Sequence, residues 1–209
     1  MERKVNIESV KELFKGNFIG PKELKSISRK IELDIPGKLP EIPYSWKELS
    51  QKKGEYLLFL SVPQLKNGIK ISILSLKELF GHDPDKSEPC FYNQDWYLKE
   101  EFVKIELELK WNLIRKKVIE KTRAVDPKEI EMNISFPSAV TSTYAFFIYK
   151  LVYNITLWQH EFIWCSDRDH NQDRIYVGKY TDVDGVNKNG FSIHRHLALR
   201  NCYASIDAL

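Results

Sequence analysis

The stretch AVTSTYAFFIYKLVYNITLW, residues 139–158, decides the fold that we expect for this chain. Large apolar side chains recur along it at three- and four-residue steps, as on the buried face of a helix: Val140, Tyr144, Phe147, Leu151 and Ile155. Lys150 near its middle argues against a membrane span, because a charge at the centre of a bilayer costs about 2.5–3.5 kcal/mol. The pattern therefore predicts one long core helix over residues 138–158, packed inside the protein.

Two earlier stretches have the character of strands. Residues 56–62 form a continuous apolar run, which is typical of a strand buried on both faces. In residues 105–113, apolar side chains at the odd positions alternate with polar ones at the even positions. This period of two predicts a strand with one buried and one solvated face, and it places Trp111 in the core.

Short apolar segments separated by polar turns follow the predicted helix. Phe162–Cys165, Arg174–Gly178 and Phe191–His194 are divided by turns rich in Asp, Asn and Gly, which is typical of a small antiparallel meander. Together with the helix, these segments predict an α+β fold: a mostly antiparallel sheet with one long core helix packed across it and an N-terminal helical arm.

The clearest candidate boundary lies in residues 35–44, where prolines stand at 36, 40 and 43. Proline disfavours both helix and sheet interiors, so an extended connector is expected there. This predicts an N-terminal helical arm at 1–34, a Pro-rich connector at 35–44 and a main α+β domain at 45–209. Limited proteolysis is then expected to cut first within the connector.

Composition narrows the class of protein. The 209 residues hold 32 basic and 29 acidic side chains, a balance too even to indicate a nucleic-acid-binding surface. The three cysteines have no CxxC spacing, and the first residues show no secretory signal, so a soluble cytoplasmic protein with free thiols is expected. With no membrane signal either, a protein or a small ligand is the candidate partner.

The turn after Cys165 contains an oxygen-bearing side chain at every second position: Asp167, Asp169, Asn171 and Asp173. Calcium loops use this spacing because alternate side chains of a tight turn can converge on one cation. An EF-hand also needs Gly and Glu at later positions, where this chain has Gln172 and Gly178. Turn formation alone equally explains the Asp and Asn residues, so the divalent cation stays an open hypothesis, with Asp182 and Asp184 of the next turn as further candidates.

A second candidate metal site is the His194–Arg195–His196 segment. Two histidines separated by one residue lie on the same face of a strand, a geometry that transition-metal sites use. The segment lacks the following Glu of a cupin-type site. An ordinary polar edge strand is the alternative interpretation.

A third candidate is catalytic. Pro84-Asp85 followed by Glu108 and Lys110 has the spacing of a PD-(D/E)xK nuclease, in which two carboxylates hold Mg²⁺ and a lysine steadies the attacking water. Alternating charges on a solvated strand face explain Glu108 and Lys110 as well.

Taken together, the sequence favours a non-enzymatic binding or interaction protein with a structural divalent cation in its C-terminal turns. The alternative is a metal-dependent hydrolase or nuclease.

Overall fold

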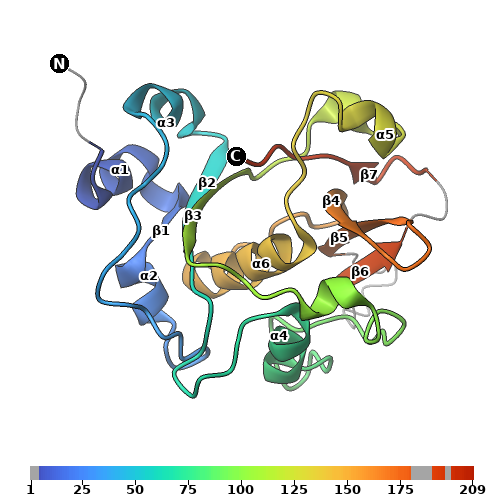
Figure 1. Cartoon of the computed structure of the whole chain (residues 1–209), viewed down its shortest axis with the longest axis horizontal. Helices are drawn as coiled ribbons and strands as arrows, with labels where there is room; N and C mark the ends of the chain where they lie inside the picture. The colour runs from blue at the N-terminus through green and yellow to red at the C-terminus, as the bar shows by residue number, and fades with distance from the viewer. Residues whose placement is uncertain (1–4, 180–189, 196–198) are drawn as a thin grey trace.

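The computed structural model describes residues 5–179, 190–195 and 199–209, and it contains two sheets with a long helix between them (Figure 1). The helices are α1 (Ile7–Phe14), α2 (Pro21–Ser26), α3 (Trp46–Lys52), α4 (Ile73–Phe80), α5 (Pro127–Ile130) and α6 (Ala139–Tyr153). The strands are β1 (Phe18–Ile19), β2 (Tyr56–Ser61), β3 (Lys110–Arg115), β4 (Phe162–Arg168), β5 (Arg174–Lys179), β6 (Phe191–Arg195) and β7 (Tyr203–Ala204). Short 3₁₀ turns η1 (Lys15–Asn17), η2 (Glu101–Lys104) and η3 (Glu120–Thr122) connect them.

The first sheet has the order β1-β2-β3. Strand β2 is buried along its whole length, as the apolar run predicts, and it pairs antiparallel with β3 from Tyr56 opposite Arg115 to Ser61 opposite Lys110. Strand β1 joins the other edge of β2 in parallel, with Phe18 opposite Leu58. The sheet is therefore mixed.

The second sheet has the order β6-β5-β4-β7. The predicted meander forms β4, β5 and β6, which pair antiparallel in sequence order. Strand β7 then pairs in parallel with β4, with Phe162 opposite Tyr203. From β7 the chain runs on to the first sheet, where Ala208 pairs with Ile114 at the free edge of β3.

Helix α6 lies between the two sheets and contacts β2 of the first sheet and β4 and β5 of the second (Figure 1). Residues 139–149 are all buried, including the polar Thr141, Ser142 and Thr143, because strands of both sheets contact the helix. It begins at the Ser138 N-cap and ends at Tyr153, earlier than the predicted Trp158. Asn154 adopts a left-handed conformation with φ 57°, which stops the helix there.

The α+β class is confirmed, but the arrangement differs from the prediction in two ways. Two mixed sheets replace one mostly antiparallel sheet. The strand predicted over residues 105–113 is β3, Lys110–Arg115, because β2 provides partners only from Arg115 back to Lys110. Ile105, expected to be buried, is 47 % exposed, and Asn112, expected to face water, is buried. Trp111 is buried as predicted.

Residues before the proline connector are packed into the same core as the rest of the chain. Val10, Phe14 and Leu24 belong to the main cluster of buried side chains, and β1 extends the first sheet. Side chains from residues 5–34 therefore share a core with residues after the connector, while the division at 1–34, 35–44 and 45–209 stays a prediction. The proteolytic boundary at 35–44 stays a prediction.

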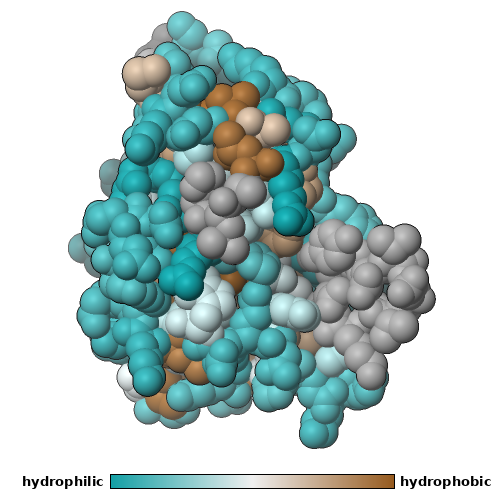
Figure 2. Space-filling model, turned by 90° about the vertical axis from the view of Figure 1, so that its right-hand side faces the viewer, coloured by the Kyte–Doolittle hydropathy of each residue, from teal (hydrophilic) through white to brown (hydrophobic). Residues whose placement is uncertain are grey.

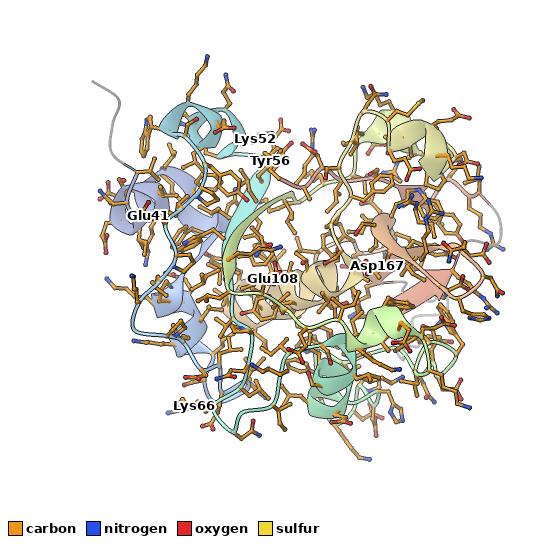
Figure 3. The ribbon with its side chains drawn as sticks, viewed as in Figure 1. Glu41, Lys52, Tyr56, Lys66, Glu108 and Asp167 are labelled. Carbon is orange, nitrogen blue, oxygen red and sulfur yellow. The ribbon has the colours of Figure 1, made fainter. Side chains whose placement is uncertain are left out.

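The segment after β7 is tied to the first sheet by side chains as well as by its backbone. Tyr56 Oη donates a hydrogen bond of 2.8 Å to Asp207 Oδ2, and Lys52 Nζ lies 3.7 Å from the same oxygen. Figure 3 shows Lys52 and Tyr56 together at this end of β2. Burial and the nearby Asp207 carboxylate raise the pKa of Tyr56, so its hydroxyl remains a donor. Among the described residues, none of the helices has the length and apolar character needed to cross a bilayer.

Candidate functional site

The turn between β4 and β5 is organised by the carboxylate of Asp169. Its side chain is fully buried, and Oδ1 accepts hydrogen bonds from the backbone N–H groups of Asn171 (2.9 Å) and Asp173 (2.8 Å). The Asp169 N–H in turn donates to the Asp173 carbonyl at 2.9 Å. This is the turn chemistry for which Asp is favoured, and it fixes one carboxylate oxygen while leaving Oδ2 to face other groups.

Glu100 approaches this turn from a segment far away in the sequence. Its Oε2 accepts a hydrogen bond of 3.0 Å from the backbone N–H of His170, and its Oε1 lies 2.6 Å from His170 Nδ1. The loop that contains Trp96 and Glu100 is held in place by Trp96, whose indole N–H donates to the Ile193 carbonyl of β6 at 3.0 Å. The loop and the hairpin turn are thereby fixed against each other.

The result is a cluster of three potential metal ligands. One ligand atom each from Glu100, Asp169 and His170 lies within 4.8 Å of the others. Glu100 and Asp169 are buried, whereas the His170 side chain is 64 % exposed and keeps the cluster open to solvent. Figure 2 shows the side of the molecule that lies on the right in Figure 1, and its visible coloured surface is mostly hydrophilic with small hydrophobic patches.

A fixed positive charge lies beside this cluster. Arg195 Nη1 is 3.4 Å from Asp169 Oδ2, and the guanidinium also lies over the Trp96 ring, 5.3 Å from its centroid. The site therefore combines two carboxylates, one guanidinium and one imidazole. The arginine partly neutralises a buried carboxylate that would otherwise be costly to desolvate.

Only one of the four residues predicted in this turn has its side chain in the cluster. Asp169 is a member, whereas the contacts of Asn171 and Asp173 with it come from their backbone. Asp167 points elsewhere: its Oδ2 accepts a hydrogen bond of 2.6 Å from the Ala139 N–H at the start of α6. Burial raises the pKa of Asp167.

His194 occupies an aromatic environment and not the cluster. Its ring stacks on Tyr176 with centroids 5.3 Å apart, and Phe162 meets it edge-on at 5.2 Å. Its Nδ1 lies 3.4 Å from Gln94 Nε2. Burial lowers the pKa of His194 to about 4. The paired candidate His196 lies outside the described residues, as do Asp182 and Asp184.

The three nuclease-type candidates are found in different surroundings. Asp85 borders a pocket with Lys150 and Lys179. Glu108 and Lys110 form an exposed ion pair of 3.1 Å, and Lys110 borders another pocket, beside β3. Figure 3 labels Glu108, which lies just before β3 in the chain. No observed contact brings Asp85 to the Glu108–Lys110 pair among the described residues.

The sequence pattern pointed to Asp169 but could not have found Glu100. Alternating oxygen side chains drew attention to the turn, yet the second carboxylate comes from the segment YLKEEF, which has no metal-ligand spacing. Only the tertiary contact between that loop and the hairpin brings the two together. No protein-family model, curated protein or solved structure matches this chain.

Proposed function

We propose that this chain is a non-enzymatic binding protein that holds a divalent cation between its second sheet and the loop before η2. The carrying observation is that ligand atoms of Glu100, Asp169 and His170 lie within 4.8 Å of one another. Two carboxylate oxygens and one imidazole nitrogen at this spacing can be drawn onto one ion at ordinary metal–ligand distances of about 2.0–2.2 Å.

The ligand types favour Zn²⁺ or Mn²⁺ over Ca²⁺. An imidazole suits transition metals, whereas Ca²⁺ takes six to eight oxygen ligands, and only Asp169 of the oxygen-rich turn supplies its side chain to the cluster. The ion would replace the contact between Glu100 Oε1 and His170 Nδ1 or use the other ring nitrogen of His170. Because an imidazole must be neutral to bind a metal, affinity is expected to fall in acid.

The role that fits this position is structural. Glu100 lies in a loop and Asp169 and His170 in a hairpin turn, so one ion would join two segments that are distant in the sequence. A ligand that binds only the folded state stabilises it by mass action. The metal-bound protein would then present the second sheet and the loop that contains Trp96 and Glu100 as one rigid surface.

Thermal unfolding with and without metal tests the proposal. With Zn²⁺ or Mn²⁺ in large excess over its dissociation constant, the melting temperature of the metal-free protein is expected to rise by about 5 °C or more. Glu100→Gln and His170→Gln should abolish that rise. The matched control is His82→Gln, which removes an exposed histidine outside the cluster and should leave the rise intact. No rise in the wild type, or an equal rise in His170→Gln, would contradict the proposal.

A further inference from the structure

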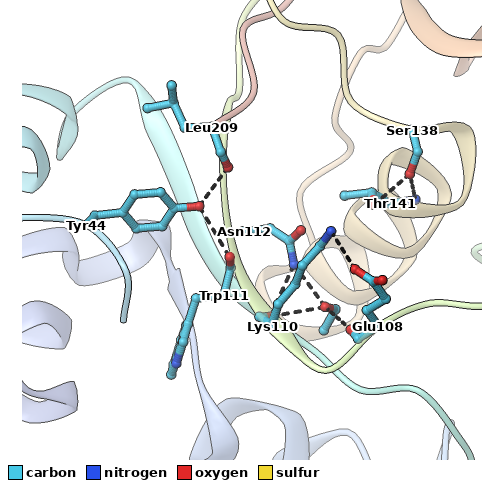
Figure 4. A network of polar contacts seen from close by, with 9 residues as sticks. Tyr44, Glu108, Lys110, Trp111, Asn112, Ser138, Thr141 and Leu209 are labelled. Carbon is cyan, nitrogen blue, oxygen red and sulfur yellow. Dashed lines mark hydrogen bonds and ion pairs between the residues drawn. The ribbon is translucent and has the colours of Figure 1, made fainter. Parts of the chain in front are cut away.

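A pocket of about 420 Å³ lies between the first sheet and the start of α6, and it shares no residue with the Glu100–Asp169–His170 cluster. Strand β3 forms one wall with Trp111 and Asn112, and residues 136–138 and Thr141 form the opposite wall. Tyr44 from the connector closes one end. Figure 4 shows the polar side chains of this region, with the strand and the helix start facing each other.

Asn112 presents an unused acceptor to this pocket. The residue is only 4 % exposed, and its Nδ2 donates to Ser61 Oγ at 3.0 Å and to the Lys110 carbonyl at 3.2 Å. Ser61 Oγ donates to backbone carbonyls, so it must accept from the amide, which fixes the orientation of Asn112. Its Oδ1 receives no hydrogen bond from any residue that the structure describes. Figure 4 shows this oxygen on the side of the amide opposite to those contacts.

The opposite wall provides an unused donor. Ser138 Oγ and Thr141 Oγ1 are 2.8 Å apart, and Ser138 Oγ also accepts the backbone N–H of Thr141 at 3.2 Å. Two hydroxyls that share one hydrogen bond use one of their two protons, whichever of them donates. The other proton has no acceptor among the described residues, and Thr141 is only 8 % exposed. The N-terminus of the 15-residue helix α6 adds partial positive charge on this side.

The remaining wall residues select for shape and charge. Phe136 and Pro137 offer flat apolar surfaces, whereas the Trp111 side chain points to the other face of the sheet, where it stacks on Phe18. Lys110, the charged side chain on the rim, is paired with Glu108 at 3.1 Å. Burial raises the pKa of Tyr44 to about 12, so its hydroxyl remains neutral, and it donates to the Leu209 carbonyl at 2.7 Å. An uncharged ligand suits these walls better than an ion does.

We propose that this pocket binds a small, flat, uncharged molecule with an amide or lactam group. The N–H of the ligand would donate to Asn112 Oδ1, and its carbonyl would accept the free hydroxyl proton of the Ser138–Thr141 pair. In the part of the chain that the structure describes, this oxygen and this proton have no hydrogen-bond partner, so both are available to a ligand. The inference is independent of the cation site, since the two share no residue.

A ligand series on the wild-type protein is the first test. Benzamide has the required donor, acceptor and flat ring, acetophenone lacks the N–H donor, and benzoate has a negative charge. We expect saturable binding of benzamide, followed by shifts in the NMR signals of the Asn112 side-chain amide. Acetophenone and benzoate should bind about tenfold more weakly, as expected when a buried polar group is left unpaired. No saturable binding of benzamide, or equal binding of acetophenone, would overturn the proposal, and preference for benzoate would show an anion site instead.

A matched pair of variants is the second test. Thr141→Val alone would leave the Ser138 hydroxyl proton free to donate to the ligand, so the test is the double variant Ser138→Ala/Thr141→Val, which removes both hydroxyls. Benzamide affinity should fall about tenfold, the effect of one neutral hydrogen bond. Thr156→Val, at a residue that borders a different pocket, is the control and should leave the affinity unchanged. Thermal unfolding shows that the variants are folded, and equal affinities of the double variant and the control would overturn the assignment of the Ser138–Thr141 pair.

Discussion

Arg195 and Asp169 are paired at the edge of the Glu100–Asp169–His170 cluster, with Nη1 3.4 Å from Oδ2. The Asp169 side chain is fully buried, while Arg195 is partly exposed and lies over Trp96. The guanidinium thus already contacts a carboxylate oxygen of Asp169 that a metal could use as a ligand. The arginine and a divalent cation are thus expected to compete for the same oxygen.

Replacing Arg195 with Gln should therefore strengthen cation binding. The variant removes a positive charge next to a buried carboxylate, so the metal-free protein loses stability and the metal has no competitor. We expect a larger Zn²⁺-induced rise in melting temperature than in the wild type. Arg168→Gln, on the same hairpin but directed to Glu131 and the Gln172 carbonyl, is the control. A rise no greater than that of the wild type would show that Arg195 does not compete.

Two substitutions of Asp169 separate its role in the turn from its role as a ligand. Asp169→Asn keeps an oxygen that can accept the N–H groups of Asn171 and Asp173, so the turn should survive while the metal-induced stabilisation is lost. Asp169→Ala removes both functions and should lower the free energy of unfolding by about 1–3 kcal/mol without metal. Chemical denaturation measures both. Equal losses of metal-free stability in the two variants would contradict the turn assignment.

His194 predicts a specific acid sensitivity. Its pKa is about 4 in the folded protein against an ordinary value of 6.5, so below 6.5 the unfolded chain binds the extra proton. The stabilising contribution is then complete above pH 6.5 and falls between pH 6.5 and 4, by at most about 3 kcal/mol. His194→Gln should be less stable at pH 7 but lose less stability on acidification. A parallel pH dependence in the two proteins would contradict this expectation.

Trp111 is a test of the core of the first sheet. It is buried, stacks on Phe18 with ring centroids 5.6 Å apart, and its indole N–H donates to the Pro40 carbonyl at 3.0 Å. Trp111→Ala should lower the free energy of unfolding by about 3–5 kcal/mol. Trp111→Phe keeps a ring and should cost less, mainly through the lost hydrogen bond. A urea midpoint close to that of the wild type for Trp111→Ala would refute its structural role.

The sequence predicted best where one local signal decided the outcome. The strand predicted at 56–62 and the helix beginning at Ser138 are both observed, because a continuous apolar run and a three- and four-residue spacing are local signals. The alternation over 105–113 misled at Asn112, which is buried because Ser61 on the paired strand supplies a polar partner. Pairing between distant segments also determined the split into two sheets and the position of Glu100 beside His170. Such contacts leave no periodic trace in the sequence.

Residues 203–209 cover one edge of each sheet, pairing with β4 through Tyr203 and with β3 through Ala208. During synthesis on the ribosome, all the other strands precede this segment. A nascent chain that has already formed β3 and β4 therefore exposes unpaired backbone N–H and C=O groups along two strands until the segment emerges. Exposed edges of this kind are where chains pair with one another and aggregate, so this protein should depend on chaperones most while β3 and β4 have formed and residues 203–209 have not yet emerged.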